Sequence, residues 1–517
     1  MSKNVPLQRG QLVLFLFLLN QTISANAATP DCSDQTIHCV GPGLEFNTSI
    51  DHVEKAFQAA ANVAKAGDTI AIKGGTYEHK TNSSSKIFLT INASGTSSAP
   101  ITIKSFDGEN AHIKGFGFSE GTEGPSVGDE KLIYVNGDYV HIKNLELSYS
   151  SRWGLVLSGS YGLVENVSVH DSWKSNILIY GKDRNIEYNT VRYVESYRSR
   201  HGTGLWILPS ASTPKIIRGT LVENSFLHNN GYQPDSKKVP GVSGESVGGG
   251  NSDGIGAFKN CAESAADYKV LNLCPESTLK GNITWHNADD GTDISFGDGS
   301  ELIDNISYEN GPEGNKGFKV YAKVRGGITF TGNVAMGNIS SGFELQIDET
   351  GYLYNNTSIR NDLHGYRAAF GTGGKLTATN NLGAYNKGSR DIETGDQVVN
   401  TTNWAENKDG NPQITTPDFS NASVSTEALE TRTITQKVLA IKHQFQKALT
   451  PLQGSPLIDA GTIVSGIHCP RADDNATNPM EPTQGCRHWL GKAPDIGAYE
   501  FGAPIFNPPM PPTLTVE

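Results

Sequence analysis

An asparagine recurs at short intervals through the middle of the chain, each time followed by a short run typical of a β-strand, as in VENVSV, IDNISY and YNNTSI. The recurring residues are Asn144, Asn166, Asn189, Asn224, Asn282, Asn305, Asn333, Asn356 and Asn381, at intervals of 22, 23, 35, 58, 23, 28, 23 and 25 residues. A base period of about 22 to 25 residues indicates a solenoid, in which each coil buries its apolar side against the next.

The residues between the asparagines indicate the type of solenoid. Val, Ile, Thr and Tyr alternate with polar residues, the LxxLxL pattern of leucine-rich repeats is missing, and no helical run fits. The sequence therefore predicts an all-β fold, a right-handed parallel β-helix. Asparagine suits one place in each coil, because its amide can bond the turn backbone, stack with its copies and tolerate a left-handed φ.

Both ends of such a solenoid need covers, since an open coil exposes unpaired strand edges. We expect an N-terminal capping helix at about 50–66, coils over about 67–390 and a closing region over about 391–517. The apolar face of the cap would consist of Val53, Phe57, Ala60 and Val63 or Ala64. In the closing region, TITQKVLAIKHQFQKAL predicts a second amphipathic helix, and SPLIDAG and PDIGAYEFG resemble closing segments of bacterial β-helix proteins.

The start of the chain reads as a secretory signal peptide over residues 1–27. Lys3 and Arg9 flank an apolar run from Leu12 to Leu19, which is too short to span a membrane, and small residues suited to cleavage follow. We therefore expect residues 28–517 to form a single secreted domain, extracellular or periplasmic, that is monomeric and free of the membrane after cleavage.

Cysteine placement and net charge agree with export. The six cysteines form three couples close in sequence, which predicts local disulfides; free thiols or a zinc site are disfavoured, because no CxxC or Cys/His cluster occurs. The couples are Cys32 with Cys39, Cys261 with Cys274, and Cys469 with Cys486. Loss of the two basic residues of the signal, Lys3 and Arg9, takes the formal charge from −12 to −14. An acidic surface argues against nucleic-acid binding, and an anionic ligand would need bound cations or a few placed basic groups.

Aligning the coils brings five strand segments into register, each with a glycine near its start. These glycines are Gly254, Gly291, Gly317, Gly342 and Gly365. Because side chains alternate along a strand, the residues that follow the glycines would point inward: Ile255, Thr292, Phe318, Phe343 and Tyr366. The next residues would stack outward in one column, which we call the outward column: Gly256, Asp293, Lys319, Glu344 and Arg367.

The same alignment gathers four carboxylates on one outward patch, those of Asp253, Asp289, Asp290 and Asp293, with Lys319 stacked directly above Asp293. Four like charges this close repel unless they are protonated or metal-bound, and an all-oxygen cluster suits Ca²⁺. The spacing is not that of an EF-hand. The alternative is a solvated acidic edge on an acidic protein.

The segments NSDGIGAF, WHNADDGTDISF and NKGFKVY, in this order on a secreted parallel β-helix, resemble the active-site signature of pectate lyases of polysaccharide lyase family 9. The resemblance covers the cap and the coils from about Asn144 to Asn381. It implies a pectin-lyase-like solenoid that cleaves polygalacturonate (pectate) by calcium-dependent β-elimination, giving 4,5-unsaturated products. It also implies a role for each site residue: Lys319 would be the base, and the calcium ligands would be Asp253, Asp289, Asp290 and Asp293.

Elimination chemistry is compatible with these roles. Cleavage of a uronate polymer removes the weakly acidic C5 proton, alpha to the carboxylate, while the C4 oxygen leaves. Calcium would neutralise that carboxylate, and cation repulsion together with partial burial would lower the pKa of Lys319 so that it accepts the proton. A salt bridge to Asp293 or Glu344 is the alternative role of Lys319. Arg367 would bind a neighbouring uronate carboxylate or pair with Glu344.

Other functions remain open at this stage. A β-helix glycoside hydrolase would use the aspartates as acid and base on water, and a non-catalytic surface protein would use them only to hold calcium. Pectate and another uronate polymer such as alginate both fit the residues named above. The 58 residues between Asn224 and Asn282 exceed one coil and would overhang the cleft, where they would influence which polymer is accepted.

Overall fold

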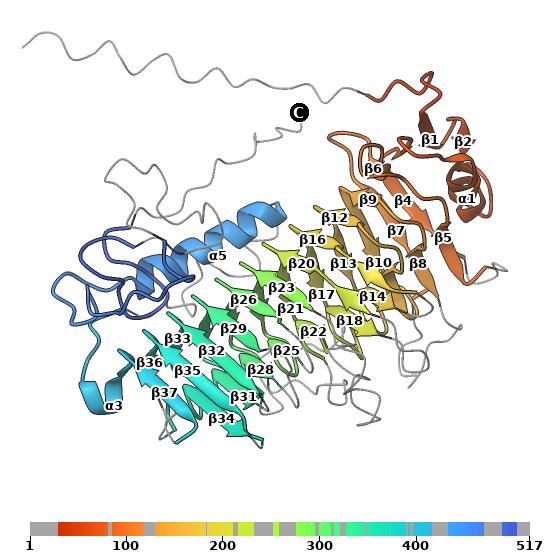
Figure 1. Ribbon diagram of the computed structural model, residues 1–517. Helices are drawn as coiled ribbons and strands as arrows, with labels where there is room; N and C mark the ends of the chain where they lie inside the picture. The colour runs from red at the N-terminus through yellow and green to blue at the C-terminus, as the bar shows by residue number, and fades with distance from the viewer. Residues whose placement is uncertain are drawn as a thin grey trace, which may run out of the picture.

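The computed structural model describes residues 29–503 except for 81–84, 118–129, 182–183, 210–215, 232–251, 258–275, 295–298, 312–314, 321–326, 348, 372, 389–390, 393–395, 416–432, 470–486 and 488. The predicted signal peptide lies outside the described residues. Over the described residues the fold is an elongated stack of parallel strands, with helix α1 (Glu54–Val63) at one end and helix α5 (Ile434–Leu449) along one side (Figure 1).

The chain passes in turn through three parallel sheets, here called A, B and C, and between Thr69 and Phe370 each coil adds one strand to each sheet. In spatial order, sheet A contains β2 (Phe46–Asn47), β1 (Ile37–Gly41), β3 (Thr69–Ile72), β6 (Ile101–Ser105), β9 (Val140–Lys143), β12 (Leu163–Glu165), β16 (Thr190–Arg192), β20 (Thr220–Glu223), β23 (Ser277–Lys280), β26 (Glu301–Ile303), β29 (Ile328–Thr331), β32 (Thr350–Tyr354), β35 (Lys375–Thr379) and β37 (Val398–Thr401). The predicted parallel β-helix is therefore confirmed.

Sheets B and C form the other two faces of the coils. Sheet B contains β4 (Gly75–Glu78), β7 (Ala111–Lys114), β10 (Leu145–Ser148), β13 (Ser168–His170), β17 (Glu195–Tyr197), β21 (Phe226–His228), β24 (Ile283–Trp285), β27 (Ile306–Tyr308), β30 (Val334–Met336), β33 (Thr357–Ile359), β36 (Leu382–Ala384) and β38 (Trp404–Ala405). Sheet C contains β5 (Ile87–Ile91), β8 (Lys131–Val135), β11 (Trp153–Leu157), β14 (Ile177–Gly181), β18 (Leu205–Pro209), β22 (Ile255–Ala257), β25 (Thr292–Ile294), β28 (Phe318–Val320), β31 (Phe343–Ile347) and β34 (Tyr366–Phe370). A short pair, β15 (Ile186–Glu187) and β19 (Ile217–Arg218), and a one-turn helix, α3 (Glu406–Asp409), complete the described elements.

Inward side chains from the three sheets fill the interior as one continuous apolar core. The five residues predicted to point inward from sheet C are all buried, with at most 2% of their surface exposed. Three of them stack as aromatic rings: the ring centroids of Phe318 and Phe343 are 4.9 Å apart, and those of Phe343 and Tyr366 are 4.8 Å apart. The predicted alternation along these strands is therefore confirmed.

One asparagine in each coil is predicted from the sequence to have two roles: a left-handed φ and a stacked amide. In the turns between sheets A and B, these roles belong to two adjacent positions. The first position is left-handed in each coil and holds Asn144, Asn166, Tyr193, Asn224, Gly281, Asp304, Gly332, Asn355, Asn380 and Thr402, with φ between 48° and 67°. The next position carries the stacked amides of Asn282, Asn305, Asn333, Asn356, Asn381 and Asn403. The predicted alignment was wrong by one residue at Asn144, Asn166 and Asn224. It was also wrong at Asn189, which donates to the carbonyl of Gly159, while Tyr193 occupies the turn.

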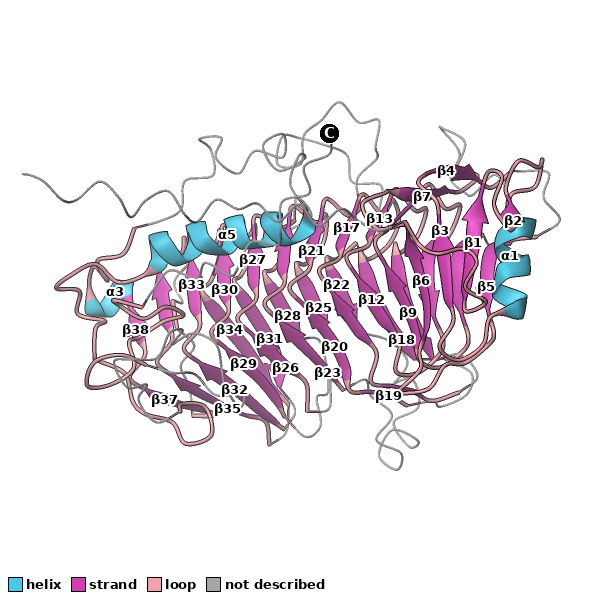
Figure 2. Ribbon diagram, turned by 90° about the horizontal axis from the view of Figure 1, so that it is seen from above, coloured by secondary structure: helices cyan, strands magenta, loops and turns pink. Residues whose placement is uncertain are grey.

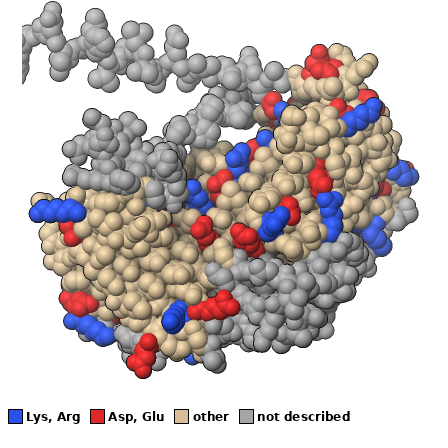
Figure 3. Space-filling model, in the orientation of Figure 1, with Lys and Arg blue, Asp and Glu red and all other residues tan. Residues whose placement is uncertain are grey.

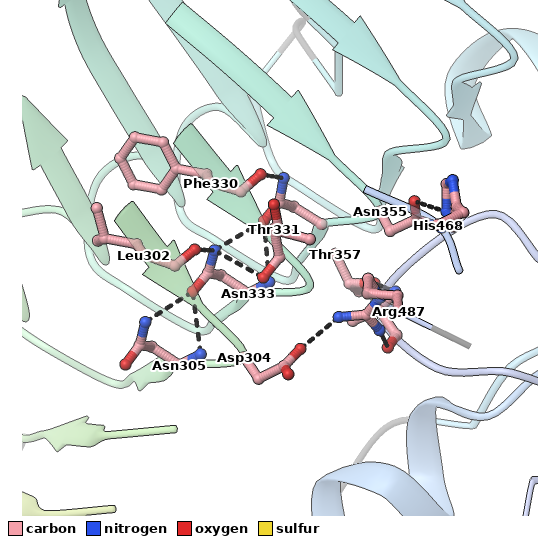
Figure 4. A network of polar contacts seen from close by, with 12 residues as sticks. Leu302, Asp304, Asn305, Phe330, Thr331, Asn333, Asn355, Thr357, His468 and Arg487 are labelled. Carbon is pink, nitrogen blue, oxygen red and sulfur yellow. Dashed lines mark hydrogen bonds and ion pairs between the residues drawn. The ribbon is translucent and has the colours of Figure 1, made fainter. Parts of the chain in front are cut away.

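Except for half-buried Asn403, the stacked asparagines are buried, and their amides are hydrogen-bonded as Asn333 illustrates (Figure 4). Its Oδ1 accepts from the backbone N–H and the amide of Asn305 at 3.0 and 2.9 Å. Its Nδ2 donates to the carbonyl of Leu302 at 2.8 Å and to Oδ1 of Asn356 at 3.0 Å. A second ladder, which the sequence analysis missed, lies in the turns between sheets B and C and consists of Asn230, Asn287, Asn310, Asn338, Asn361 and Asn386.

Helix α1 covers the N-terminal end of the solenoid, as predicted. The ring of Phe57 packs edge-on against those of Tyr77 and Phe88, with centroids 5.0 and 4.9 Å away. Of the two candidates for the end of the apolar face, Ala64 is buried and Val63 is exposed. Strand β1 precedes the cap and pairs with β3, so the first coil begins before the predicted residue 67.

Helix α5 lies along the outer face of sheet B rather than over the C-terminal end, which corrects the predicted position (Figure 2). The physical reason is that sheet B is apolar on its outer face here, at Phe226, Ile283, Ile306 and Val334, and α5 buries Val438, Ile441, Phe445 and Leu449 against it. At its start Lys437 Nζ contacts both carboxylate oxygens of Glu195, at 2.7 and 2.8 Å.

The two closing motifs pack against the same outer face. Ile496 of PDIGAYEFG donates its N–H to the carbonyl of Leu457 in SPLIDAG at 3.1 Å, and Gly497 donates to the carbonyl of Asn380 at 2.8 Å. The left-handed residues of the turns also hold the C-terminal segment: Arg487 pairs with Asp304, and His468 contacts Asn355 at 3.1 Å (Figure 4).

Among the predicted disulfides, the Cys32–Cys39 bond is present, and Cys469 is also disulfide-bonded. The other three cysteines, Cys261, Cys274 and Cys486, lie outside the described residues. Within the ranges given above, the helices are too short or too polar to cross a membrane.

We predict that Asn333→Ala lowers the free energy of unfolding by about 2 kcal/mol or more, because it leaves the buried N–H of Asn305 and the carbonyl of Leu302 without a partner. Asn166→Gly is the control, since the amide of Asn166 is exposed and glycine accepts its left-handed φ. Chemical denaturation followed by circular dichroism measures both. Equal losses in the two variants would contradict a stabilising role for the ladder.

Candidate functional site

The outward column exists as predicted. Strand register pairs Gly256 with Asp293, Asp293 with Lys319, Lys319 with Glu344 and Glu344 with Arg367. The same register pairs half-buried Trp206 with Gly256 on the preceding strand. Six successive strands of sheet C therefore present these side chains along the axis of the solenoid.

The turn between sheets B and C brings the aspartates of two coils together. The second ladder fixes Asn287, and the residues after it bond the coil below: Asp289 donates its N–H to the carbonyl of Ser252 at 3.3 Å, and Asp290 donates to Oδ1 of Asp253 at 3.1 Å. Gly291 is required here for a close approach, because a Cβ would lie 1.9 Å from Oγ of Ser307. Strand β25 can therefore leave the turn directly after the acidic residues.

Three of the four predicted calcium ligands form a compact group. Asp253, Asp290 and Asp293 each offer a carboxylate oxygen, and these oxygens lie within 4.8 Å of one another. Asp289 is also buried and adjacent, but it is not part of this group. Lys319 Nζ lies 2.8 Å from Oδ2 of Asp290 and 2.8 Å from Oδ2 of Asp293.

The electrostatics of the site are those of crowded, buried acids. Burial, together with the charge of Asp293, raises the pKa of Asp253 well above its usual value. Burial and the charge of Asp290 raise the pKa of Asp289 to about 7. An additional positive charge at this patch would therefore stabilise the ionised carboxylates.

Lys319 is held in its charged form, contrary to the expected lowering of its pKa. Burial opposes the ammonium charge, but the carboxylates of Asp290 and Asp293 outweigh burial and raise the pKa of Lys319 above its usual value. The reason is that both carboxylates face the ammonium directly. A cation that engaged these two carboxylates would remove most of that stabilisation.

The residues of the acidic cluster fit a calcium ion. Calcium takes six to eight oxygen ligands and accepts flexible carboxylate geometry. Asp253, Asp290 and Asp293 supply converging carboxylate oxygens, Asp289 lies beside them, and the described residues of the cluster bring no sulfur or nitrogen ligand. The remaining positions would be open to water or to a substrate carboxylate.

A row of basic and aromatic side chains, which the sequence analysis missed, lies in the turns that lead to the acidic cluster. Arg152 lies over the ring of Trp153, 4.0 Å from its centroid, and Arg200 lies 5.2 Å from the ring centroid of Trp173. The N–H of Lys174 bonds the carbonyl of Arg152 one coil away, at 2.8 Å. We call Arg152, Trp153, Trp173, Lys174 and Arg200 the basic row.

The sequence did carry a signal for the basic row. Three successive turns read SSRWG, DSWKS and RSRHG, so each places a basic residue next to an aromatic or imidazole ring. The ring of His201, in the third of these turns, lies against that of Trp173 at a tilt of 48°, with centroids 4.4 Å apart. The backbone connects this turn to the acidic cluster, since Gly204 donates its N–H to the carbonyl of Asp253 at 2.9 Å.

Arg367 lies at the other end of the outward column. Its side chain is half exposed, and Nη1 lies 3.3 Å from Oε2 of Glu344, as one of the two predicted roles requires.

Charged side chains of both signs lie next to one another on the face drawn in Figure 3, leaving aside the grey parts. The net negative charge of the chain therefore does not form one continuous acidic patch on that face.

Comparison with known proteins identifies relatives. A family model described as "Pel9A-like, right handed beta helix region" matches residues 45–206. Pectate lyase L of Dickeya dadantii is 25% identical over 515 residues, which cover 96% of this chain and 99% of the relative. Pectate lyase PEL9 of Emericella nidulans is 25% identical over 345 residues, covering 56% of this chain and 75% of the relative.

A solved structure supports the fold independently. The crystal structure of pectate lyase Pel9A matches with a TM-score of 0.52 and 22% identity, covering 86% of this chain and 90% of that one. The right-handed parallel β-helix and the resemblance to family 9 pectate lyases are thereby confirmed.

We predict that Asp290→Asn weakens calcium binding by about tenfold or more, since it removes a charge from a converging set of carboxylates while keeping the volume of the side chain. Isothermal titration calorimetry with CaCl₂ measures the change. Asp107→Asn, a matched change at an exposed aspartate paired with Lys104, is the control and should bind calcium like the wild type. Unchanged affinity in Asp290→Asn would exclude the cluster as the calcium site.

Proposed function

We propose that this chain, a relative of pectate lyases over nearly its whole length, is a calcium-dependent lyase that cleaves polygalacturonate by β-elimination and releases 4,5-unsaturated products. One observation carries the proposal: the Lys319 ammonium lies 2.8 Å from the carboxylates of both Asp290 and Asp293 on the outward column. The proposed base and the proposed cation site would then be adjacent, at the partly exposed side chain of Lys319.

Asp253, Asp289, Asp290 and Asp293 would hold the calcium ion. Calcium bound there supplies positive charge that neutralises the uronate carboxylate and makes the neighbouring C5 proton more acidic. The burial of these aspartates strengthens their interaction with a cation, because the low dielectric of the surroundings screens it less than water does.

Lys319 would act as the base at C5. With Asp290 and Asp293 engaged by a bound cation, Lys319 would lose the two ion pairs that keep it charged and release its proton to solvent. Its neutral amine then takes the C5 proton, the electron pair left on C5 forms the C4=C5 double bond, and the C4–O bond breaks. The leaving oxygen takes a proton from solvent. Lys319 suits this role because it follows buried Phe318 on β28 and points outward, with 20% of its side-chain surface exposed.

The basic row and Arg367 would bind substrate carboxylates on opposite sides of the reaction point. Arg367 is three strands beyond Asp293, roughly 14 Å at the usual spacing between strands, so it would contact a different sugar unit. Arg152, Lys174 and Arg200 lie on the other side. Arg152, Lys174 and the ring of Trp153 are half-buried and so partly open to a substrate, whereas Trp173 and Arg200 are buried. This arrangement favours an anionic polymer over a neutral glycan.

The proposed place of action is outside the cytoplasm. The signal-like start of the chain and the Cys32–Cys39 disulfide support secretion. A secreted enzyme would meet polygalacturonate as an extracellular polymer.

We predict that Lys319→Ala lowers kcat by about 10²- to 10⁴-fold while leaving calcium affinity close to that of the wild type, because a general base contributes about this much to the rate. Lys319→Arg should be nearly as inactive, since guanidinium stays protonated at usable pH. The assay follows the ultraviolet absorbance of the unsaturated product from polygalacturonate. Lys143→Ala, which breaks an ion pair with Glu165 on sheet A, is the control and should keep most of the activity.

Four results would redirect the proposal. If Lys319→Arg retains most of the rate and loses only melting temperature, Lys319 is a salt-bridge residue. Activity on alginate but not on polygalacturonate would assign a different uronate polymer, and cleavage without ultraviolet absorbance would indicate a hydrolase. Activity that persists in excess EGTA would exclude the calcium requirement.

A further inference from the structure

A second group of metal-ligating side chains lies on the outer face of sheet B, apart from the aspartate cluster. His112 on β7 pairs in register with Glu146 on β10, and His170 comes from β13, the next strand. One ligand atom from each of these three residues lies within 4.8 Å of the other two. Three successive coils therefore contribute one ligand each to a single point.

The two distances from Glu146 in this group are close to those between the ligands of a four-coordinate metal. Oε1 of Glu146 lies 3.2 Å from Nε2 of His170 and 3.6 Å from Nε2 of His112. Two ligands bonded to tetrahedral zinc at 2.0–2.1 Å are about 3.3 Å apart. The set of two imidazoles and one carboxylate is also one that zinc accepts, and it leaves a fourth position for water.

The surroundings orient these ligands as the outer shell of a metal site does. Nδ1 of His170 lies 2.6 Å from Oδ2 of Asp171, which is fully buried, and Arg198 holds that carboxylate through Nε at 2.9 Å and Nη2 at 2.6 Å. A carboxylate only accepts hydrogen bonds, so Nδ1 carries the proton and Nε2 points at Glu146. Metal-bound histidines commonly donate their other N–H to a carboxylate in this way.

The contact between Nε2 of His170 and Oε1 of Glu146 needs a positive charge. In the neutral tautomer both atoms are acceptors, so either a second proton or a metal ion must lie between them. Asn110 holds the other oxygen of Glu146 at 2.8 Å, and the hydroxyl of Ser148 lies 2.7 Å from Nε2 of His112. The carboxylate is thus fixed with Oε1 directed at both imidazoles.

This group is accessible and has no part in the proposed reaction. The side chains of His112, Glu146 and His170 are 19%, 29% and 8% exposed. They lie on sheet B, whereas the aspartate cluster lies between the turn and sheet C. Helix α5 reaches only as far as Glu195 on β17, which is the strand after β13.

We propose that His112, Glu146 and His170 form a binding site for a divalent cation of the zinc class, with water at the fourth position. The bound ion joins β7, β10 and β13, three neighbouring coils that α5 does not cover. Its role is to stabilise this part of the solenoid, and it is independent of the lyase reaction.

The test is calorimetric titration of the untagged mature chain with ZnCl₂, in excess CaCl₂ so that calcium fills the aspartate cluster. We expect one zinc ion per chain and a higher melting temperature with zinc. Asp171→Asn should weaken zinc binding about 10- to 100-fold, as losses in the outer shell do, and His112→Ala and His170→Ala should weaken it at least as much. Cobalt in place of zinc should give the visible absorption of a four-coordinate site.

The controls separate this site from the rest of the molecule. His141→Ala removes a half-buried histidine on sheet A and should bind zinc like the wild type, and Asp290→Asn should do so as well. Melting in EDTA shows whether His112→Ala still folds. Equal zinc binding in His112→Ala and His141→Ala, loss of zinc binding in Asp290→Asn, or no zinc bound by the wild type would overturn the proposal.

Discussion

The hydrogen bonds between buried asparagine amides set the register on which the rest of the molecule depends. Each amide in the two ladders bonds the equivalent asparagine one coil away as well as nearby backbone groups, as Asn333 does with Asn305, Asn356 and the carbonyl of Leu302. A slip of one residue would leave several buried groups unpaired and would turn every side chain of the strand to the other face. The second ladder is critical for the site, because Asn287 stands two residues before Asp289 and three before Asp290.

Much of the site could be read from the sequence, because strand alternation is a strict geometric rule. Once glycines were aligned, the rule gave Phe318 as inward and the Asp293–Lys319 pair as outward, and the register agrees. The asparagine ladders were harder to predict from the sequence, because left-handed turns and stacked amides both favour asparagine and occupy adjacent positions. The left-handed turn at Tyr193 could not be predicted, because tyrosine, unlike asparagine or glycine, does not indicate a left-handed φ.

The place of α5 could not be predicted for a different reason. Its periodicity identifies an apolar face, but amphipathicity does not say which surface that face meets. The answer lay in the strands: Phe226 and Ile306 put apolar side chains on the outside of sheet B, where polar residues would be expected. The electrostatics of the aspartates also needed coordinates. The fold disfavours the ionised form of Asp289, whose pKa rises from 3.8 to about 7. Asp289 therefore destabilises the folded state increasingly as the pH rises through that range.

Helix α5 changes how this solenoid is expected to unfold. A chain of stacked repeats contacts only its nearest neighbours, so coils at the C-terminal end can fray one at a time. Here α5 pairs with Glu195 on β17, and its apolar residues belong to one hydrophobic cluster with those of the strands of sheet B from β21 to β36. The ion pair with Glu195 joins positions 242 residues apart in the chain. The last coils cannot separate in sequence without also losing the packing of α5. The coils that α5 packs against are therefore expected to unfold together as one cooperative unit, not one coil at a time.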